Sequence, residues 1–133
     1  MLKDIEFKKV EDVGIAVVYE DVEGAMGWVS YLVNFGDSKK INVLVNSSGY
    51  GEIDEKSYKT SELRWFMGDL EPKSFAKIEE LQADILPLTN EFFVTFYIGK
   101  EIYEKKFIFV PESIVEENLT EIPVLNKKGV LIK

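Results

Sequence analysis

The fold is decided by residues 92–110, which read FFVTFYIGKEIYEKKFIFV. Two runs of β-branched and aromatic residues, 92–98 and 102–110, flank Gly99 and Lys100, and their composition predicts two strands. Glycine can open a primed two-residue turn, so the pair is expected to form an antiparallel hairpin. This register places Phe96 opposite Tyr103 and Phe92 opposite Phe107, which brings aromatic pairs onto one face.

Similar runs N-terminal to this hairpin predict further strands. They are a weak strand around Ile5 and Phe7, followed by residues 15–19, 28–35 and 41–46. Turn-forming residues 36–40 separate the last two, which are therefore expected to pair as a hairpin. Gly49 and Gly51 precede a polar stretch, which favours a long loop over residues 47–59.

Residues 60–70 fit two patterns. Their apolar side chains recur at helical spacing, but Leu63, Trp65 and Met67 also alternate as in a strand. We favour the strand, because residues 70–74 have the composition of a tight inter-strand turn that leads into the alternating stretch 75–80. A helix would leave little room between these elements.

The C-terminal tail, residues 119–133, follows an expected helical turn at 112–117. Its apolar ends are separated by residues 126–129, which can turn the chain and let Val124-Leu125 pair locally with Val130-Leu131. The alternative is strand addition to a second copy. We favour the local edge hairpin, and with it a monomer or a weak homodimer.

These signals together predict an all-β fold. Seven or eight short strands, little helix and no repeat or linker indicate one domain over residues 1–133, an antiparallel β-sandwich. The order of strands and turns resembles the immunoglobulin-like β-sandwiches.

A second resemblance rests on four stretches: 48–51 (SGYG), 60–66 (TSELRWF), 90–98 (NEFFVTFYI) and 107–111 (FIFVP). Together they resemble a family of short uncharacterised bacterial proteins, over residues 25–132. Some members carry the label of a phenylalanyl-tRNA synthetase subunit. A class II synthetase core needs several hundred residues and an arginine-based adenylate grip, whereas this chain has one arginine and no histidine. The resemblance therefore implies no activity.

Composition excludes several function classes. The 133 residues include no cysteine and no histidine, which removes the commonest metal ligands and most nucleophilic catalytic pairs, so we expect no cofactor and no metal site. A net charge of −8 argues against nucleic acid as a partner. The first residues lack the apolar run that a secretory signal needs, and no apolar stretch approaches the length of a membrane span. We therefore expect a cytoplasmic protein with no membrane partner.

Four residues stand out as candidate ligand-binding residues, and none as catalytic. Trp28, Trp65 and Tyr50 could form an aromatic platform, although buried aromatic residues are the usual content of sandwich cores. Arg64 is the only arginine. Because a guanidinium forms planar pairs with carboxylates, Arg64 is expected to contact an Asp or Glu side chain.

The leading hypothesis for function is a non-enzymatic protein-binding or accessory module that uses a sheet face or an open sheet edge. The alternative is a small-ligand or carbohydrate-binding domain that uses the surface aromatic residues. A carboxylate-dependent hydrolase is the third hypothesis, because the 24 acidic residues would supply suitable pairs.

Overall fold

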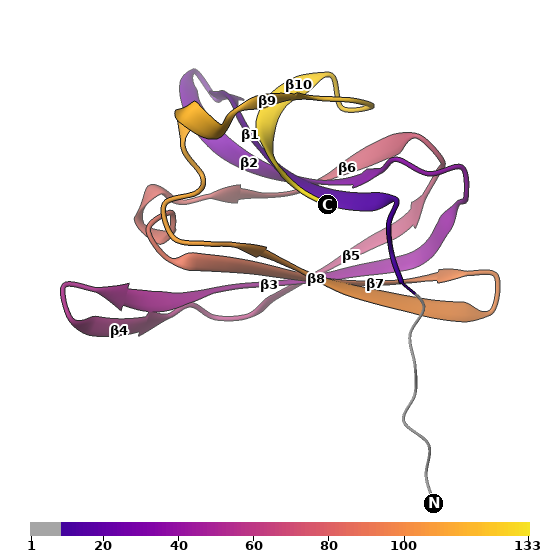
Figure 1. Cartoon of the computed structure of the whole chain (residues 1–133), viewed down its shortest axis with the longest axis horizontal. Helices are drawn as coiled ribbons and strands as arrows, with labels where there is room; N and C mark the ends of the chain where they lie inside the picture. Colours follow the sequence, from indigo (N-terminus) through magenta and orange to yellow (C-terminus); the bar gives the residue numbers. More distant parts are fainter. Residues whose placement is uncertain (1–8) are drawn as a thin grey trace, which may run out of the picture.

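The computed structural model describes residues 9–133. Within this range it forms ten strands and two short 3-10 turns (Figure 1). The strands are β1 (Val13–Val22), β2 (Ala25–Asn34), β3 (Lys40–Ile53), β4 (Lys56–Lys59), β5 (Leu63–Leu70), β6 (Ser74–Leu81), β7 (Thr89–Ile98), β8 (Glu101–Phe109), β9 (Thr120–Ile122) and β10 (Lys127–Ile132), and the turns are η1 (Ala83–Ile85) and η2 (Glu116–Asn118).

Two antiparallel sheets face each other. One has the order β6-β2-β1-β10-β9, and the other has the order β4-β3-β7-β8 with β5 also paired to β3. The division of β1, β2 and β6 from β3, β7 and β8 is that of strands A, B and E from C, F and G in immunoglobulin-like sandwiches. The predicted all-β sandwich is confirmed, with ten described strands instead of seven or eight. The expected strand around Ile5 and Phe7 lies outside the described residues.

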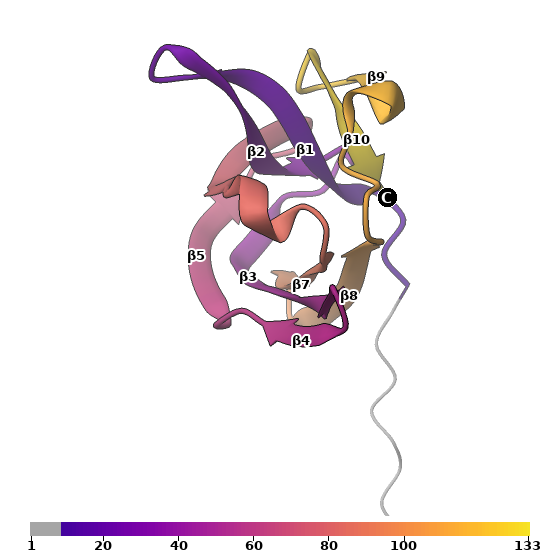
Figure 2. The ribbon, with the colours of Figure 1, turned by 90° about the vertical axis from the view of Figure 1, so that its left-hand side faces the viewer.

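The main core lies between the sheets and includes Ile15, Leu32, Val94 and Phe96. A second apolar cluster covers the opposite face of β1 and β2, where Val18 and Val33 pack with Ile122 and other residues of the tail. Figure 2 shows the β9–β10 hairpin beside β1 and β2. Both faces of β1 are therefore buried, which explains its nearly uninterrupted apolar sequence.

The predicted hairpin at residues 92–110 is confirmed in its register. Phe96 lies opposite Tyr103 and Phe92 opposite Phe107 in the β7–β8 ladder. The Phe96 and Tyr103 rings stack with centroids 5.5 Å apart. Gly99 has a φ of 59°, the positive value that opens a two-residue primed turn.

The predicted pairing of residues 28–35 with 41–46 is wrong. β2 pairs with β1 and β6, whereas β3 pairs with β4, β5 and β7, so residues 36–40 cross from one sheet to the other. Asn34 fixes this crossing, because its Nδ2 donates to the backbone oxygens of Ser38 and Glu71 at 2.9 and 3.0 Å. Lys40 is almost fully buried and its Nζ lies 2.7 Å from the Asp12 carboxylate.

The predicted loop over residues 47–59 is also wrong, because β3 continues through both glycines and turns at Asp54-Glu55 into β4. These two residues have φ values of 50° and 65°, as a type I′ turn requires. The strand predicted within residues 60–70 is confirmed as β5. Of the helical turn expected at 112–117, only the last two residues are helical, in the short η2 at Glu116–Asn118.

The tail forms the expected edge hairpin with a different pairing. Ile122 lies opposite Lys127 and Thr120 opposite Gly129, so residues 123–126 form the turn and Val124-Leu125 do not pair as a strand. β10 also pairs with β1. Lys127 anchors the hairpin, because its Nζ lies 2.9 Å from the Glu20 carboxylate and 3.2 Å from the Tyr31 hydroxyl.

Candidate functional site

The face of β3, β5, β7 and β8 that points away from the other sheet is here called the outer face. Strand register arranges its residues in rows. Leu44 lies between Phe66 of β5 and Thr95 of β7, and Asn46 lies between Arg64 and Phe93 in the next row. Phe66 and Leu44 are 70% and 47% exposed. Tyr97 and Ile102, cross-strand partners on β7 and β8, extend this apolar surface.

A hollow of about 160 Å³ lies in the middle of the outer face, lined by Leu44, Asn46, Arg64, Phe93 and Thr95 among others. The Oδ1 atom of Asn46 is buried there and accepts no hydrogen bond from the described residues. A buried acceptor without a donor costs free energy comparable to a lost hydrogen bond. The hollow therefore lies beside an exposed guanidinium, and one of its lining residues holds a buried acceptor without a donor in the described chain.

The predicted contact between Arg64 and a carboxylate is wrong for the described part of the chain. Arg64 is exposed on β5, and no Asp or Glu of residues 9–133 lies within ion-pair distance of its guanidinium. The ion pair on the same face joins Lys106 to Glu91 at 3.7 Å. The five donors of Arg64 thus remain available to a partner.

The three aromatic candidates do not form one platform. Trp28 packs against Tyr19, with ring centroids 4.7 Å apart and ring planes tilted by 38°, and lines a depression beside β6. Trp65 points inward from β5 and its Nε1 donates to Ser47 Oγ at 3.3 Å. Tyr50 lies near the end of the outer face, where its hydroxyl is 3.4 Å from the Glu91 carboxylate. Trp65 and Arg64 are neighbours on opposite faces of β5.

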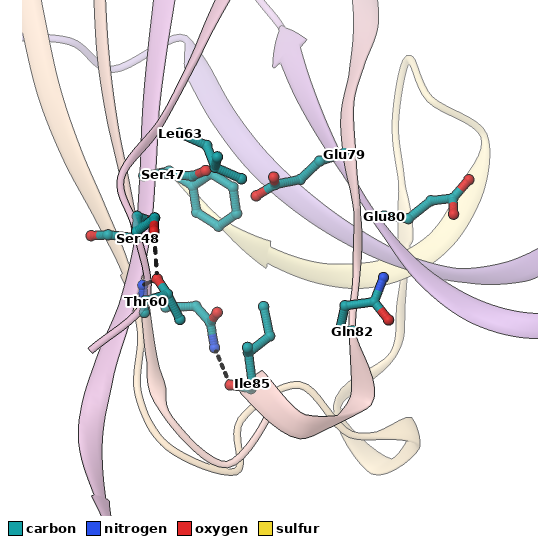
Figure 3. A pocket seen from close by; sticks show the side chains of 12 residues that line it. Ser47, Ser48, Thr60, Leu63, Glu79, Glu80, Gln82 and Ile85 are labelled. Carbon is teal, nitrogen blue, oxygen red and sulfur yellow. Dashed lines mark hydrogen bonds between the residues drawn. The ribbon is translucent and has the colours of Figure 1, made fainter. Parts of the chain in front are cut away.

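A second cavity, of about 190 Å³, opens at one end of the sandwich between β3, β5 and β6. Figure 3 shows the Glu79 carboxylate directed into it toward Ser47, while Glu80 points away. Burial raises the pKa of Glu79, and its hydrogen bond with Ser47 opposes that rise in part. The nearby hydroxyl of Thr60 already accepts a hydrogen bond from the Gly49 N–H at 2.7 Å. This hydroxyl therefore holds the backbone of β3 in place.

Sequence reasoning missed Leu44, Phe66 and Phe93 as surface residues, and it placed Asn46 outward without identifying it as a residue of the hollow. The available signal was the alternation within 63–67, because a strand that buries Leu63, Trp65 and Met67 must present Arg64 and Phe66 on its other face. Their neighbours on β3 and β7 could not be identified without the sheet order. Glu79 was missed because nothing in its local sequence shows that it points into a cavity.

Searches against family models, curated proteins and solved structures find no match to this chain. In the part of the chain that the structure describes, no helix has the length and apolar composition needed to cross a membrane.

Proposed function

We propose that this chain is a non-enzymatic protein-binding module whose contact surface is the outer face. The observation that carries the proposal is the exposed guanidinium of Arg64, which has no partner in the described chain and lies beside the exposed apolar side chains of Phe66 and Leu44. An extended segment of another protein could pair with this guanidinium and cover the apolar side chains.

The apolar part of the surface supplies the binding free energy. Phe66 and Leu44 are adjacent across the β3–β5 ladder, and both are substantially exposed. Removing such side chains from water contributes about 25 cal/mol per Å² of apolar area. Aromatic residues and arginine also dominate the energetic centres of protein interfaces.

The polar groups define the chemistry of the partner. Arg64 offers a planar fork that suits a carboxylate. The partner segment is therefore an extended peptide that contains an Asp or Glu beside apolar residues. Its acidic side chain contacts Arg64, and its apolar side chains pack on Phe66 and Leu44.

Selection from a displayed library of random peptides tests this function. We expect enriched peptides to carry an acid next to apolar residues and to shift the backbone NMR signals of Leu44, Arg64 and Phe66. Phe66→Ser should abolish binding, whereas Tyr58→Ser on β4, which also removes an exposed aromatic ring, should not. Selected peptides that bind Phe66→Ser as tightly as the unmodified protein would exclude the outer face.

A double-mutant cycle tests the polar contact. Replacing the peptide acid by its amide and Arg64 by Gln should each weaken binding, and the two changes together should cost less than their sum. Lys59→Gln on β4 is the control for loss of one positive charge. Additive losses would show that the acid binds elsewhere.

The end cavity supports a second candidate, a site for a small ligand. Glu79 is partly buried there, and no Lys or Arg of the described chain forms an ion pair with it. Its carboxylate and the hydroxyl of Ser47 suit an ammonium or hydroxyl group. Ethanolamine, which carries both, should shift the NMR signals of Ser47 and Glu79 in the unmodified protein but not in Glu79→Gln. Unchanged signals in the unmodified protein would remove this candidate.

A further inference from the structure

Strand β8 forms an open edge of its sheet, because in the described chain it pairs with β7 alone. The two-residue turn makes Ile98 and Glu101 a hydrogen-bonded pair, and such pairs alternate along an antiparallel ladder. The even-numbered residues between 102 and 108 therefore direct their N–H and C=O groups away from β7. These groups can pair with another strand.

The sequence of β8 is complementary to itself when a second copy runs antiparallel to it and the pair is centred on Lys105. Ile102 of one copy then lies opposite Ile108 of the other, and Glu104 lies opposite Lys106. All four are even-numbered, so these are the residues whose backbone groups face the partner. Apolar and oppositely charged pairs directly across two strands each stabilise the pairing.

Exposure and register both favour this arrangement. The side chains of Ile102 and Ile108 are 37% and 40% exposed on the outer face, where cross-strand packing would cover them. A shift of two residues would place Glu104 opposite Glu104, or Lys106 opposite Lys106. Each of these three registers places one like-charged pair directly opposite, which is Lys105 with Lys105 in the central register. Only the register centred on Lys105 also forms two Glu104–Lys106 pairs, so this register is favoured.

The Lys105 side chain lies on the other side of the sheet from Glu104 and Lys106. Its Nζ donates to the backbone oxygen of Val10 at 3.0 Å and lies 5.3 Å from the centre of the Phe107 ring. Each Lys105 ammonium is therefore bound within its own copy. Lysines on an edge strand usually discourage strand addition. In this pairing Lys106, which forms a 3.7 Å ion pair with Glu91 of its own chain, gains a second carboxylate in Glu104 of the other copy.

We propose that two copies of this chain associate through β8, forming one continuous sheet with a two-fold axis at Lys105. The interface is isologous, with the same residues contributed by both copies. Because the axis is perpendicular to the sheet, both outer faces lie on the same side of the dimer. The inference stands on the edge and the sequence of β8, independently of the proposed peptide binding.

A charge swap tests the register by sedimentation over a range of concentrations. Glu104→Lys alone and Lys106→Glu alone each place like charges opposite each other twice, and each should raise the dissociation constant about tenfold or more. A mixture of the two variants should form heterodimers, and the double variant E104K/K106E should dimerise like the unmodified protein. The matched single-charge control is Lys59→Glu on β4, which should leave dimerisation unchanged.

A single cysteine tests the axis, because the chain contains none. Lys105→Cys should form a disulfide-linked dimer under mild oxidation, since each position 105 lies opposite its copy. Ser57→Cys on the exposed strand β4 is the control and should remain unlinked. Circular dichroism checks that each variant keeps its fold.

Three results would overturn the proposal. The first is an unmodified protein that stays monomeric at every concentration. The second is a dimer that the charge-swap variants leave unchanged. The third is a dimer that dissociates on Phe66→Ser, because that association would use the outer face instead of β8. Loss of peptide binding with dimerisation intact would contradict only the proposed function.

Discussion

Phe96 shows what one aromatic side chain contributes when its strand register places it inward. It is 1% exposed and stacked on Tyr103. We expect Phe96→Ala to lower the free energy of unfolding by about 3–5 kcal/mol, through lost transfer energy and a residual cavity. Chemical denaturation measures this loss. Phe66→Ala, on the opposite face of the sheet, should change stability by no more than about 0.5 kcal/mol. Equal effects of the two substitutions would contradict the assignment of the faces.

Glu79 is a residue whose charge opposes folding. Burial is the main cause that raises its pKa above the ordinary value of 4.5, so the folded chain binds this proton more tightly than the unfolded chain. The stability contributed by the protonated form is present below pH 4.5 and is lost as the pH rises through the folded pKa. Glu79→Gln should therefore raise the melting temperature at neutral pH and not at low pH.

The exposed neighbour on the same strand supplies the control for this prediction. Glu80→Gln should give no comparable gain, because Glu80 points away from the cavity. Melting temperatures recorded across the acidic range measure both variants. A gain for Glu79→Gln that stays the same at every pH would mean that its charge is not the cause.

At the scale of elements, the tail hairpin depends on a close approach at Gly129. A Cβ at this position would lie 2.8 Å from Ile122 Cδ1 and 2.9 Å from the Val17 backbone oxygen. We expect Gly129→Ala to cost about 1–3 kcal/mol, because β10 must move away from β1 or β9. Lys128→Ala, at the exposed neighbouring position, should cost no more than about 0.5 kcal/mol. Chemical denaturation of both variants measures the difference, and a neutral Gly129→Ala would show that the hairpin can shift freely.

Elements could be predicted from the sequence where a local turn fixes the pairing. A two-residue turn at Gly99 and Lys100 is compatible with only one pairing register of β7 and β8, and the structure has that register. Residues 36–40 look equally turn-like, but the chain crosses there into the other sheet. Asn34 donates to the backbone of this crossing at Ser38 and of a second crossing at Glu71. The alternation of apolar and polar residues shows which side chains share a face of a strand, but it does not show which strands lie beside it. The outer face could not be predicted for this reason, since its rows of residues come from four strands.

At the scale of the whole molecule, the tail completes the sandwich by pairing with β1. Ile122 and Leu125 pack with Ala16, Val18 and Val33 on the far side of that sheet, and β10 pairs with the edge of β1. A chain that ends at Asn118 should therefore lose its cooperative unfolding transition, because it exposes an apolar sheet face and an unpaired edge of β1. Denaturation followed by near-UV circular dichroism measures this. A cooperative transition in the shortened chain would show that the first eight strands are sufficient.

The pairing of β1 with β10 also sets the order of events during synthesis. β1 ends at Val22, and β10 begins only at Lys127. At translation rates of about 5–20 residues per second, roughly 5–20 s pass between the synthesis of β1 and the synthesis of β10, its second neighbour in the sheet. During that interval a nascent chain displays Ala16 and Val18 together with an open strand edge. Ribosome-bound chaperones recognise such surfaces. We therefore expect a chaperone to remain bound to the nascent chain until β10 has emerged and paired with β1.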